Sequence, residues 1–490
     1  MNRCQKFNTV IALAALIATP ALAQLPPGLD EYIEHARVAW DVPGIAVTVV
    51  RDGRVVAAKG YGVRTLGKEA RVDENTMFDI ASLAKSFTAA AVATLVDDGT
   101  MRWDDPVRRW LPQLEFSDPY RTQNVTMRDL LAHRVGVEPG NFVFRFTNYS
   151  TAEVLRRVRF LKEREPFRAG MVYSNIGYTA AGEAAAAAAK TSWTELVRTR
   201  LVEPLGMRDT TVGVEHDRGA NFASPHAILA GVHQPIRNKK AMVIFPANGV
   251  NSTARDMAKW LLFQLGDGTW EGKRIISAEA MNEMHSPQII ISVPRSFRAA
   301  RGVRFFGAYG LGWQIMDFHG HPMMWHSGSA DGMPVYMAIL PEEHIGVAVM
   351  TNTWAAPVLH GTIAARILDT LLGNKPQELP LPPKPSPPAD PPRVSGTSPS
   401  KPLDAYAGTY ADPLYGDMIV KMENGRLALY FADDEAADLE HWHYDTFRVR
   451  WRDRAYEDFD TLAAFSLDAS GMPKRMEMKL FRDSVDATRK

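Results

Sequence analysis

A proline-rich segment divides this chain into two parts and limits how each can fold. The segment spans residues 375–402 and contains Pro380, Pro382, Pro383, Pro385, Pro387, Pro388, Pro391 and Pro392. Proline lacks the backbone N–H that helices and sheets require, and such runs form extended, semi-rigid linkers. We therefore predict a larger domain before the linker (24–374) and a small domain after it (403–490).

The first 23 residues have the pattern of a secretory signal peptide. A short basic start precedes an apolar run from Val10 to Ala18, and Ala21-Leu22-Ala23 supplies the small residues of a cleavage site. The apolar run is too short to span a bilayer. Cys4 is the only cysteine and would be removed with this peptide, so the exported chain would hold no disulfide. The sequence thus predicts a secreted protein, in the bacterial periplasm, with no transmembrane span after cleavage.

The larger domain starts and ends with strand-like sequence and is mostly helical between. Ile45–Val50 and Val55–Ala58 are predicted strands joined at Asp52-Gly53, a strong hairpin signal. Capping boxes at Ser192 and Thr253 predict the starts of two helices. Further strands are expected at residues 309–316, 334–340 and 346–350, before a final helix at 357–372. This order predicts an α+β fold with one antiparallel sheet built from both ends of the domain and covered by helices.

The small domain is predicted to be all-β. Short β-type runs occur at residues 418–422, 426–430, 446–451 and 461–467, with turns at Asn424-Gly425 and Ser470-Gly471. Such spacing favours a small antiparallel barrel or sandwich.

Composition excludes several classes of function. The 56 basic residues balance the 56 acidic ones, so no net charge attracts nucleic acid or an anionic membrane. The sequence contains neither a phosphate-binding glycine loop nor a basic stripe with interleaved aromatic residues. A Gly-x-Ser-x-Gly nucleophile elbow is also missing. We expect no cofactor and no nucleic-acid partner, and the oligomeric state is left open.

Ser82 and Lys85 form the first candidate catalytic pair. They lie three residues apart at the start of an alanine-rich run that stops at Gly99, and this spacing places them on one face of a helix. A serine hydroxyl needs an adjacent base, and a lysine can serve when burial keeps its amine neutral. The apolar neighbours of Lys85 make this plausible, although an isolated Ser-x-x-Lys is usually a solvated helix face.

Two further motifs follow in order. Tyr173-Ser174-Asn175 lies in a loop of the helical region, and His326-Ser327-Gly328 lies late in the β-rich part. Ser-x-x-Lys, Tyr-x-Asn and His-x-Gly in this order resemble the serine β-lactamase and penicillin-binding protein superfamily. Three other stretches are also similar to it, namely Leu130–His133, Pro204–Met207 and Tyr309–Trp313.

The resemblance covers residues 28–373 and is closest to one group within the superfamily. That group holds class C β-lactamases, DD-carboxypeptidases with a His-x-Gly motif, D-aminopeptidases and class VIII esterases. The part after the linker, with Tyr406-Ala407-Gly408-Thr409-Tyr410, is similar to a lipocalin-like domain appended to such hydrolases.

The resemblance implies a role for each matching residue. Ser82 would be the acylated nucleophile and Lys85 its base. Tyr173 would pass protons to the leaving group and activate the hydrolytic water. Asn175 would position Lys85 and the substrate carbonyl, and His326 would orient Tyr173 or a substrate group.

The third motif is implied to supply part of the oxyanion hole. It also differs from the third motif of the β-lactamases. The hole would combine the backbone N–H of Ser82 with one just after Gly328, from Ser329 or Ala330. β-Lactamases usually have Lys-Thr-Gly at this motif, where the cation helps to hold the carboxylate of the antibiotic. His326 is charged only part of the time near neutral pH, which favours a peptidase or esterase. We therefore expect small peptides first, small esters second and β-lactams third.

The sequence leaves two alternative functions open, and it suggests one role for the small domain. The chain could be a non-catalytic penicillin-binding or sensor protein, acylated at Ser82 without turnover. A metallohydrolase could use His319-x-His321 or His441-x-His443, but no acidic or cysteine partners stand at ligand spacing, and we expect no metal. A small-domain loop at His441–Asp445 could reach over the active site and limit substrate length.

Overall fold

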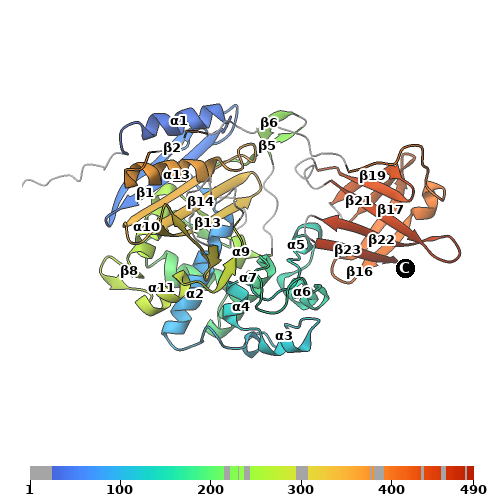
Figure 1. Cartoon of the computed structure of the whole chain (residues 1–490), viewed down its shortest axis with the longest axis horizontal. Helices are drawn as coiled ribbons and strands as arrows, with labels where there is room; N and C mark the ends of the chain where they lie inside the picture. Colours follow the sequence, from blue (N-terminus) through green and yellow to red (C-terminus); the bar gives the residue numbers. More distant parts are fainter. Residues whose placement is uncertain are drawn as a thin grey trace, which may run out of the picture.

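The structure is a computed structural model that describes residues 25–213, 221–229, 231–236, 243–293, 307–375, 378–379, 391–431, 435–453, 460–480 and 483–490. The predicted signal peptide and residues 376–377 and 380–390 of the predicted linker lie outside them. The described residues form a larger α+β body and a closed β-barrel (Figure 1). The predicted fold class is confirmed.

One eight-stranded sheet organises the larger body. Every pair of neighbouring strands is antiparallel, and β1 lies between β2 and β15, so that the two ends of the domain meet, as expected. In spatial order the strands are β10 (Ile289–Ile291), β11 (Gly307–Tyr309), β12 (Gln314–Phe318), β13 (His321–Ala330), β14 (Met333–Leu340), β15 (Ile345–Thr351), β1 (Gly44–Arg51) and β2 (Arg54–Gly62).

Both faces of this sheet are buried. Successive side chains of a strand point to opposite faces, and in β1 Val47 and Val49 join a core with α1 (Leu29–Ala39) and α13 (Leu359–Leu372). Ala46 and Val50 join a second core, to which α10 (Ala254–Leu265) contributes. The sheet is therefore the middle layer between two helical layers (Figure 1).

The helical region contributes two central alanine-rich helices, α2 (Ala84–Asp97) and α7 (Asn175–Ala189). All residues of α2 from Ala84 to Leu95 are buried, including Lys85. The other helices are α3 (Pro119–Asn124), α4 (Met127–Leu131), α5 (Val143–Phe146), α6 (Thr151–Arg157), α8 (Trp193–Val197), α9 (Phe245–Asn248) and α11 (Ala278–His285). Short 3₁₀ turns lie at Ala81–Leu83, Val107–Arg109, Val158–Phe160 and Leu403–Tyr406, and a π-helical turn at Arg198–Val202.

Short strands complete the larger body. β3 (Phe78–Asp79), β7 (Val250–Ser252) and β4 (Thr211–Val212) form a three-stranded sheet. Two hairpins pair β5 (His226–Leu229) with β6 (Val232–Pro235) and β8 (Thr269–Trp270) with β9 (Lys273–Arg274). Among the described helices, none has the length and apolar character needed to cross a membrane.

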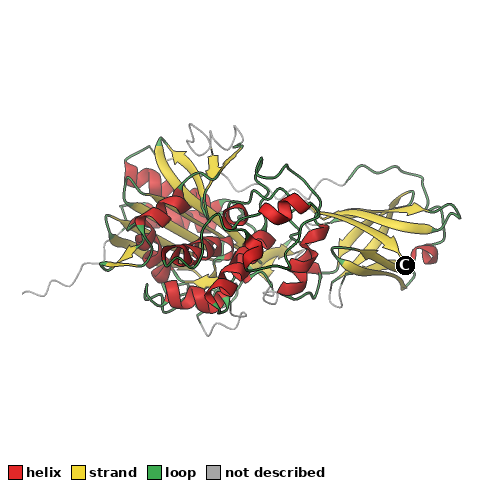
Figure 2. Ribbon diagram, turned by 90° about the horizontal axis from the view of Figure 1, so that it is seen from below, coloured by secondary structure: helices red, strands yellow, loops and turns green. Residues whose placement is uncertain are grey.

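The C-terminal body is a closed antiparallel barrel. Aromatic side chains fill its interior: the ring of Tyr406 lies 5.2 Å from that of Phe447 and 5.3 Å from that of Phe465. An eight-stranded barrel has room for little more than such side chains. Figure 2 shows that helices of the larger body, rather than its large sheet, lie next to the barrel. Its strands are β16 (Gly408–Asp412), β17 (Gly416–Glu423), β18 (Arg426–Tyr430), β19 (Ala436–His443), β20 (Thr446–Trp451), β21 (Thr461–Leu467), β22 (Pro473–Leu480) and β23 (Asp483–Arg489).

Candidate active site

Ser82 lies in a 3₁₀ turn immediately before α2, rather than within the α-helix itself. The preceding residue, Ala81, has a φ of 47°, in the left-handed region that costs an L-residue energy. Asp79 stabilises this turn because its Oδ1 accepts a hydrogen bond from the Ala81 N–H at 2.7 Å. Strained backbone of this kind is found at functional sites, where the surroundings hold it in place.

Lys85 lies one turn further on, and its side chain is completely buried. Its Nζ lies 3.1 Å from Ser82 Oγ, 2.7 Å from Asn175 Oδ1 and 3.0 Å from the Ala247 carbonyl oxygen. Burial lowers the pKa of the Lys85 amine well below its ordinary value. A neutral amine has two N–H groups for the two carbonyl oxygens and a lone pair for the Ser82 hydroxyl. This geometry would let Lys85 act as the base for Ser82 when its amine is neutral.

Tyr173 approaches the same oxygen from the loop before α7. Its hydroxyl donates to Ser82 Oγ at 2.9 Å. The next residue, Ser174, caps α7 by accepting the Gly177 N–H at 3.0 Å, which fixes the chain where Tyr173 leaves the loop. Burial raises the pKa of the Tyr173 phenol, so it stays protonated near neutral pH and can give a proton rather than take one.

Asn175 links the second motif to Lys85. Its Oδ1 accepts from Lys85, and its Nδ2 donates to Asn141 Oδ1 at 3.1 Å. Because Asn141 presents an oxygen, the Asn175 amide turns its nitrogen toward Asn141 and its own oxygen toward Lys85. Neither Asn141 nor the Ala247 carbonyl belongs to a recognisable local motif, so the sequence alone did not indicate either group.

His326 lies on β13 close to these residues, but its hydrogen-bond partners are elsewhere. Its Nδ1 lies 2.7 Å from the Ser327 carbonyl oxygen, and its Nε2 lies 3.0 Å from the Tyr309 hydroxyl. A carbonyl only accepts, so Nδ1 carries the proton and Nε2 accepts from Tyr309. The rings of His326 and Tyr173 are 6.4 Å apart. Burial lowers the pKa of His326 to about 3, so the imidazole is neutral.

The backbone of β13 passes directly beside the nucleophile. A Cβ atom at Gly328 would lie 2.8 Å from the Ser82 nitrogen, so only glycine lets the strand approach this closely. β12 pairs with β13 only up to Trp325, which leaves the edge of the following residues without a strand partner among the described strands on that side. Ser329 is exposed on this segment and Ala330 is buried. An oxyanion hole between Ser82 and one of these two residues stays a prediction.

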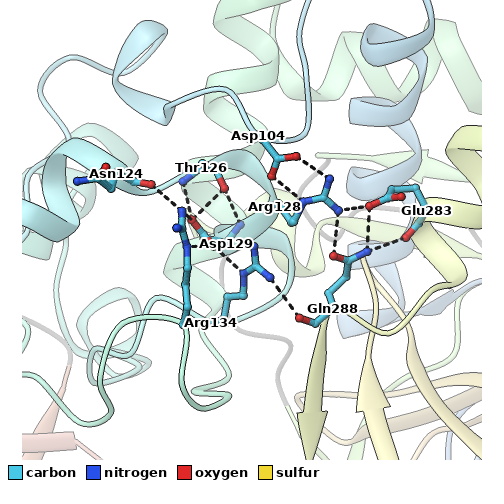
Figure 3. Close-up of polar contacts among 9 residues, drawn as sticks. Asp104, Asn124, Thr126, Arg128, Asp129, Arg134, Glu283 and Gln288 are labelled. Carbon is cyan, nitrogen blue, oxygen red and sulfur yellow. Dashed lines mark hydrogen bonds and ion pairs between the residues drawn. The ribbon is translucent and has the colours of Figure 1, made fainter.

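A buried polar network supports the site from behind. His133 follows α4, accepts the Ser174 N–H at Nδ1 over 3.1 Å, and packs its ring 4.3 Å from that of Tyr173. Asp129, also fully buried, accepts from the Thr126 N–H and, at 2.6 Å, from Arg134 Nε (Figure 3). This carboxylate fixes the segment that leads to His133.

Arg128 extends the network to the other side of the helical region. It pairs with Asp104 at 2.7 Å and with Glu283 of α11, and it donates to Gln288 Oε1 at 2.9 Å (Figure 3). The segment around Leu130–His133, one of the stretches similar to the superfamily, is therefore anchored on both sides.

The metal alternative lacks a ligand set within the described residues, where no group of three histidine, cysteine, aspartate or glutamate side chains could hold an ion. His319 Nε2 lies 3.2 Å from Asp369, and His321 Nδ1 lies 2.8 Å from Glu343. Each of these two histidines therefore pairs with one carboxylate.

Together, a large antiparallel sheet with helical layers and a serine, a buried lysine and a tyrosine that share one hydrogen-bonded centre define a β-lactamase and penicillin-binding protein-like serine hydrolase. The family model described as Beta-lactamase matches residues 29–372, and the chain belongs to this family. A second model, described as a domain of unknown function (DUF3471), matches residues 392–489, the barrel with the end of the linker.

Relatives and solved structures agree with this assignment. The chain is 26% identical to unguisins hydrolase ungD' of Aspergillus campestris, over 82% of this chain and 78% of that protein. It is 25% identical to the D-alanyl-D-alanine-carboxypeptidase/endopeptidase AmpH of Escherichia coli, over 72% of this chain and 92% of AmpH. The octameric penicillin-binding protein homologue from Pyrococcus abyssi has the same fold, with a TM-score of 0.62 at 23% identity over 94% of this chain and 99% of that one.

Proposed function

We propose that this protein cleaves peptide or amide bonds of small peptides through a covalent acyl-enzyme at Ser82. One observation carries the proposal: Lys85 Nζ and Tyr173 Oη lie 3.1 and 2.9 Å from the same serine oxygen. Acyl transfer needs a nucleophile, a base and a proton donor within hydrogen-bond distance of one another.

In the acylation step, the Ser82 hydroxyl gives its proton to the neutral Lys85 amine while Oγ bonds to the substrate carbonyl carbon. The negative charge that develops on the carbonyl oxygen lies next to the backbone at Ser82 and Gly328, where N–H donors would stabilise it. The carbon–nitrogen bond then breaks, and the leaving amine takes the proton from Lys85 through the Tyr173 hydroxyl.

Deacylation reverses these roles. A water molecule attacks the ester carbon and gives its proton through Tyr173 to Lys85, and the ester bond to Oγ breaks. The serine oxygen regains a proton from Lys85, which returns the amine to its neutral form. No separate glutamate is needed because Lys85 and Tyr173 act in both steps.

The neutral His326 supports a substrate other than a β-lactam antibiotic, because it offers no cation for a carboxylate. The printed names of two relatives, a hydrolase of unguisins and a D-alanyl-D-alanine-carboxypeptidase/endopeptidase, favour peptide substrates, including peptides with D-residues. Small esters are the second candidate and β-lactams the third. The signal-like N-terminus leads us to place this activity in the bacterial periplasm.

The test is a hydrolysis panel on the wild-type protein and on Ser82→Ala. The panel contains nitrocefin, p-nitrophenyl esters, D- and L-aminoacyl amides and D-Ala-D-Ala peptides. We expect turnover of at least one peptide or amide, and a loss of at least about three orders of magnitude in Ser82→Ala. Stoichiometric labelling of Ser82 by penicillin or a fluorophosphonate without turnover of any substrate would instead indicate a binding or sensor protein.

A further inference from the structure

The barrel is packed against the helices that adjoin the active site. Phe146 of α5 stacks on Trp451 of the barrel, with ring centroids 4.4 Å apart, and lies 5.3 Å from the ring of Phe431. Tyr149 donates its hydroxyl to the Tyr415 carbonyl at 3.1 Å. Figure 1 shows α5 and α6 facing β16 and β23 across this contact. The two bodies therefore share one buried apolar contact.

A carboxylate of the barrel, Asp483, is buried within this contact. Asp483, the first residue of β23, is 2% exposed. Its Oδ1 accepts the Gly140 N–H at 3.0 Å, and its Oδ2 accepts the Phe142 N–H at 3.3 Å. Burying a carboxylate is costly unless donors surround it, and here the backbone of another domain supplies them.

The turn that Asp483 binds is the one that carries Asn141. Gly140 has a φ of 62°, and a Cβ there would lie 2.8 Å from Ile176 and 2.9 Å from Leu161, so the turn is closely packed. Between the two bound N–H groups, the Asn141 side chain accepts from Asn175, whose oxygen accepts from Lys85. A chain of three contacts thus runs from the barrel to the catalytic amine.

We propose that Asp483 is a positioning residue for the acyl transfer: by holding the Gly140–Phe142 backbone, it places Asn141 so that the Asn175 amide keeps its oxygen on Lys85. The barrel then helps to build the active site. This inference rests on the proposed function, because it assumes that Lys85 is the base for Ser82.

The first experiment compares Asp483→Ala with Asp438→Ala in the full chain. Asp438 is the matched control, since it is a barrel carboxylate on β19 that pairs with Arg452 at 2.7 Å on the exposed surface. Displacing a catalytic group by about 1 Å can cost about 100-fold in rate. We therefore expect Asp483→Ala to slow fluorophosphonate labelling of Ser82 and kcat by about 10- to 100-fold. KM should change little, and Asp438→Ala should match the wild type.

A double-mutant cycle with Asn141→Ala distinguishes positioning from a general loss of structure. If Asp483 acts through Asn141, adding Asp483→Ala to Asn141→Ala should cost little further labelling rate. Hydrogen exchange should show faster exchange of the Gly140 and Phe142 amides in Asp483→Ala and unchanged exchange in α2. Asp483→Asn keeps one acceptor oxygen and should recover part of the rate, and it replaces the alanine variant if that variant does not fold.

Two results would overturn the inference: a folded Asp483→Ala protein labelled at the wild-type rate, or additive losses in the cycle. A failure of the proposed function looks different, because the wild-type protein itself would then turn over no substrate, whether or not Ser82 is labelled. In that case the exchange rates of Gly140 and Phe142 still report whether Asp483 holds the turn.

Discussion

Lys85 can act as a base only while its amine is neutral, and its burial makes that form available near neutral pH. Lys85→Arg should therefore abolish most of the activity, because a guanidinium does not lose its proton in proteins. General bases contribute about 10²- to 10⁴-fold, and we expect a loss in that range in the labelling rate of Ser82. A folded Lys85→Arg protein that is labelled normally would mean that another group takes the serine proton.

Protonation of Lys85 should also determine how kcat/KM depends on pH. The lowered pKa of Lys85 means that kcat/KM should fall as the pH decreases and the amine becomes protonated. His326, with its pKa lowered to about 3, is already neutral and should add nothing to this acid limb. In His326→Gln the midpoint of the acid limb should thus stay at its wild-type pH, whatever the change in maximal rate. A midpoint that moves in this variant would assign the limb to the imidazole.

At the scale of elements, the approach of β13 to the Ser82 turn should be the most sensitive contact. In Gly328→Ala the new Cβ would lie 2.8 Å from the Ser82 nitrogen and 3.0 Å from Ala81 Cβ, both parts of a tightly held turn. We expect about 100-fold slower labelling of Ser82, together with a lower thermal stability, because the new Cβ overlaps backbone that must shift. Gly177→Ala is the control: its Cβ would lie 3.5 Å from Ser174, an ordinary contact, and labelling should be unchanged.

Local patterns predicted much of this architecture. The Asp52-Gly53 hairpin joins β1 to β2, and the caps at Ser192 and Thr253 begin α8 and α10, because turns and caps depend on a few adjacent residues. The order of three motifs also selected Ser82, Lys85, Tyr173 and Asn175, which the structure brings together by direct hydrogen bonds.

Other parts of the site could not be predicted because they depend on contacts between distant segments. The Ala247 carbonyl reaches Lys85 through backbone alone, and any residue type supplies such a carbonyl. Asn141 matters because the turn around it is held in place, not because of a motif. The partner of His326 proved to be Tyr309, seventeen residues earlier in the sequence, on a strand that does not pair with β13.

At the scale of the whole molecule, β23 of the barrel contacts the larger body, and the suggestion that a loop at His441–Asp445 reaches over the active site stays a prediction. The hairpin at His441–Asp445 binds the end of the linker: Arg393 donates to the Trp442 carbonyl at 2.8 Å, and Ser400 N–H donates to Asp445 at 2.8 Å. Asp483 on β23 instead reaches the active-site turn. Removing the barrel would take Trp451 and Phe431 away from Phe146 and expose its ring, so the two bodies should behave as one cooperative unit.

Asp483 should also make the stability of that unit depend on pH. The carboxyl faces Glu138 of the larger body and the Tyr415 phenol of the barrel, along with the N–H groups of Gly140, Asn141 and Phe142. Burial, helped by the charge of Glu138, raises the pKa of Asp483 from 3.8 to about 6. The folded state therefore holds this proton more tightly than the unfolded chain, and its stabilising effect is complete below about pH 4 and lost as the pH rises through about 6.

Each pH unit of that difference corresponds to about 1.4 kcal/mol, so the contribution lost between about pH 4 and pH 7 is on the order of 2–3 kcal/mol. The measurement is urea unfolding across this range for the wild type and for Asp483→Asn, in which the side chain at 483 cannot titrate. Because both proteins share every other titrating group, the wild type should lose stability relative to Asp483→Asn as the pH rises. A constant difference, or one of the opposite sign, would show that the Asp483 carboxyl is ionised in the folded protein at little cost.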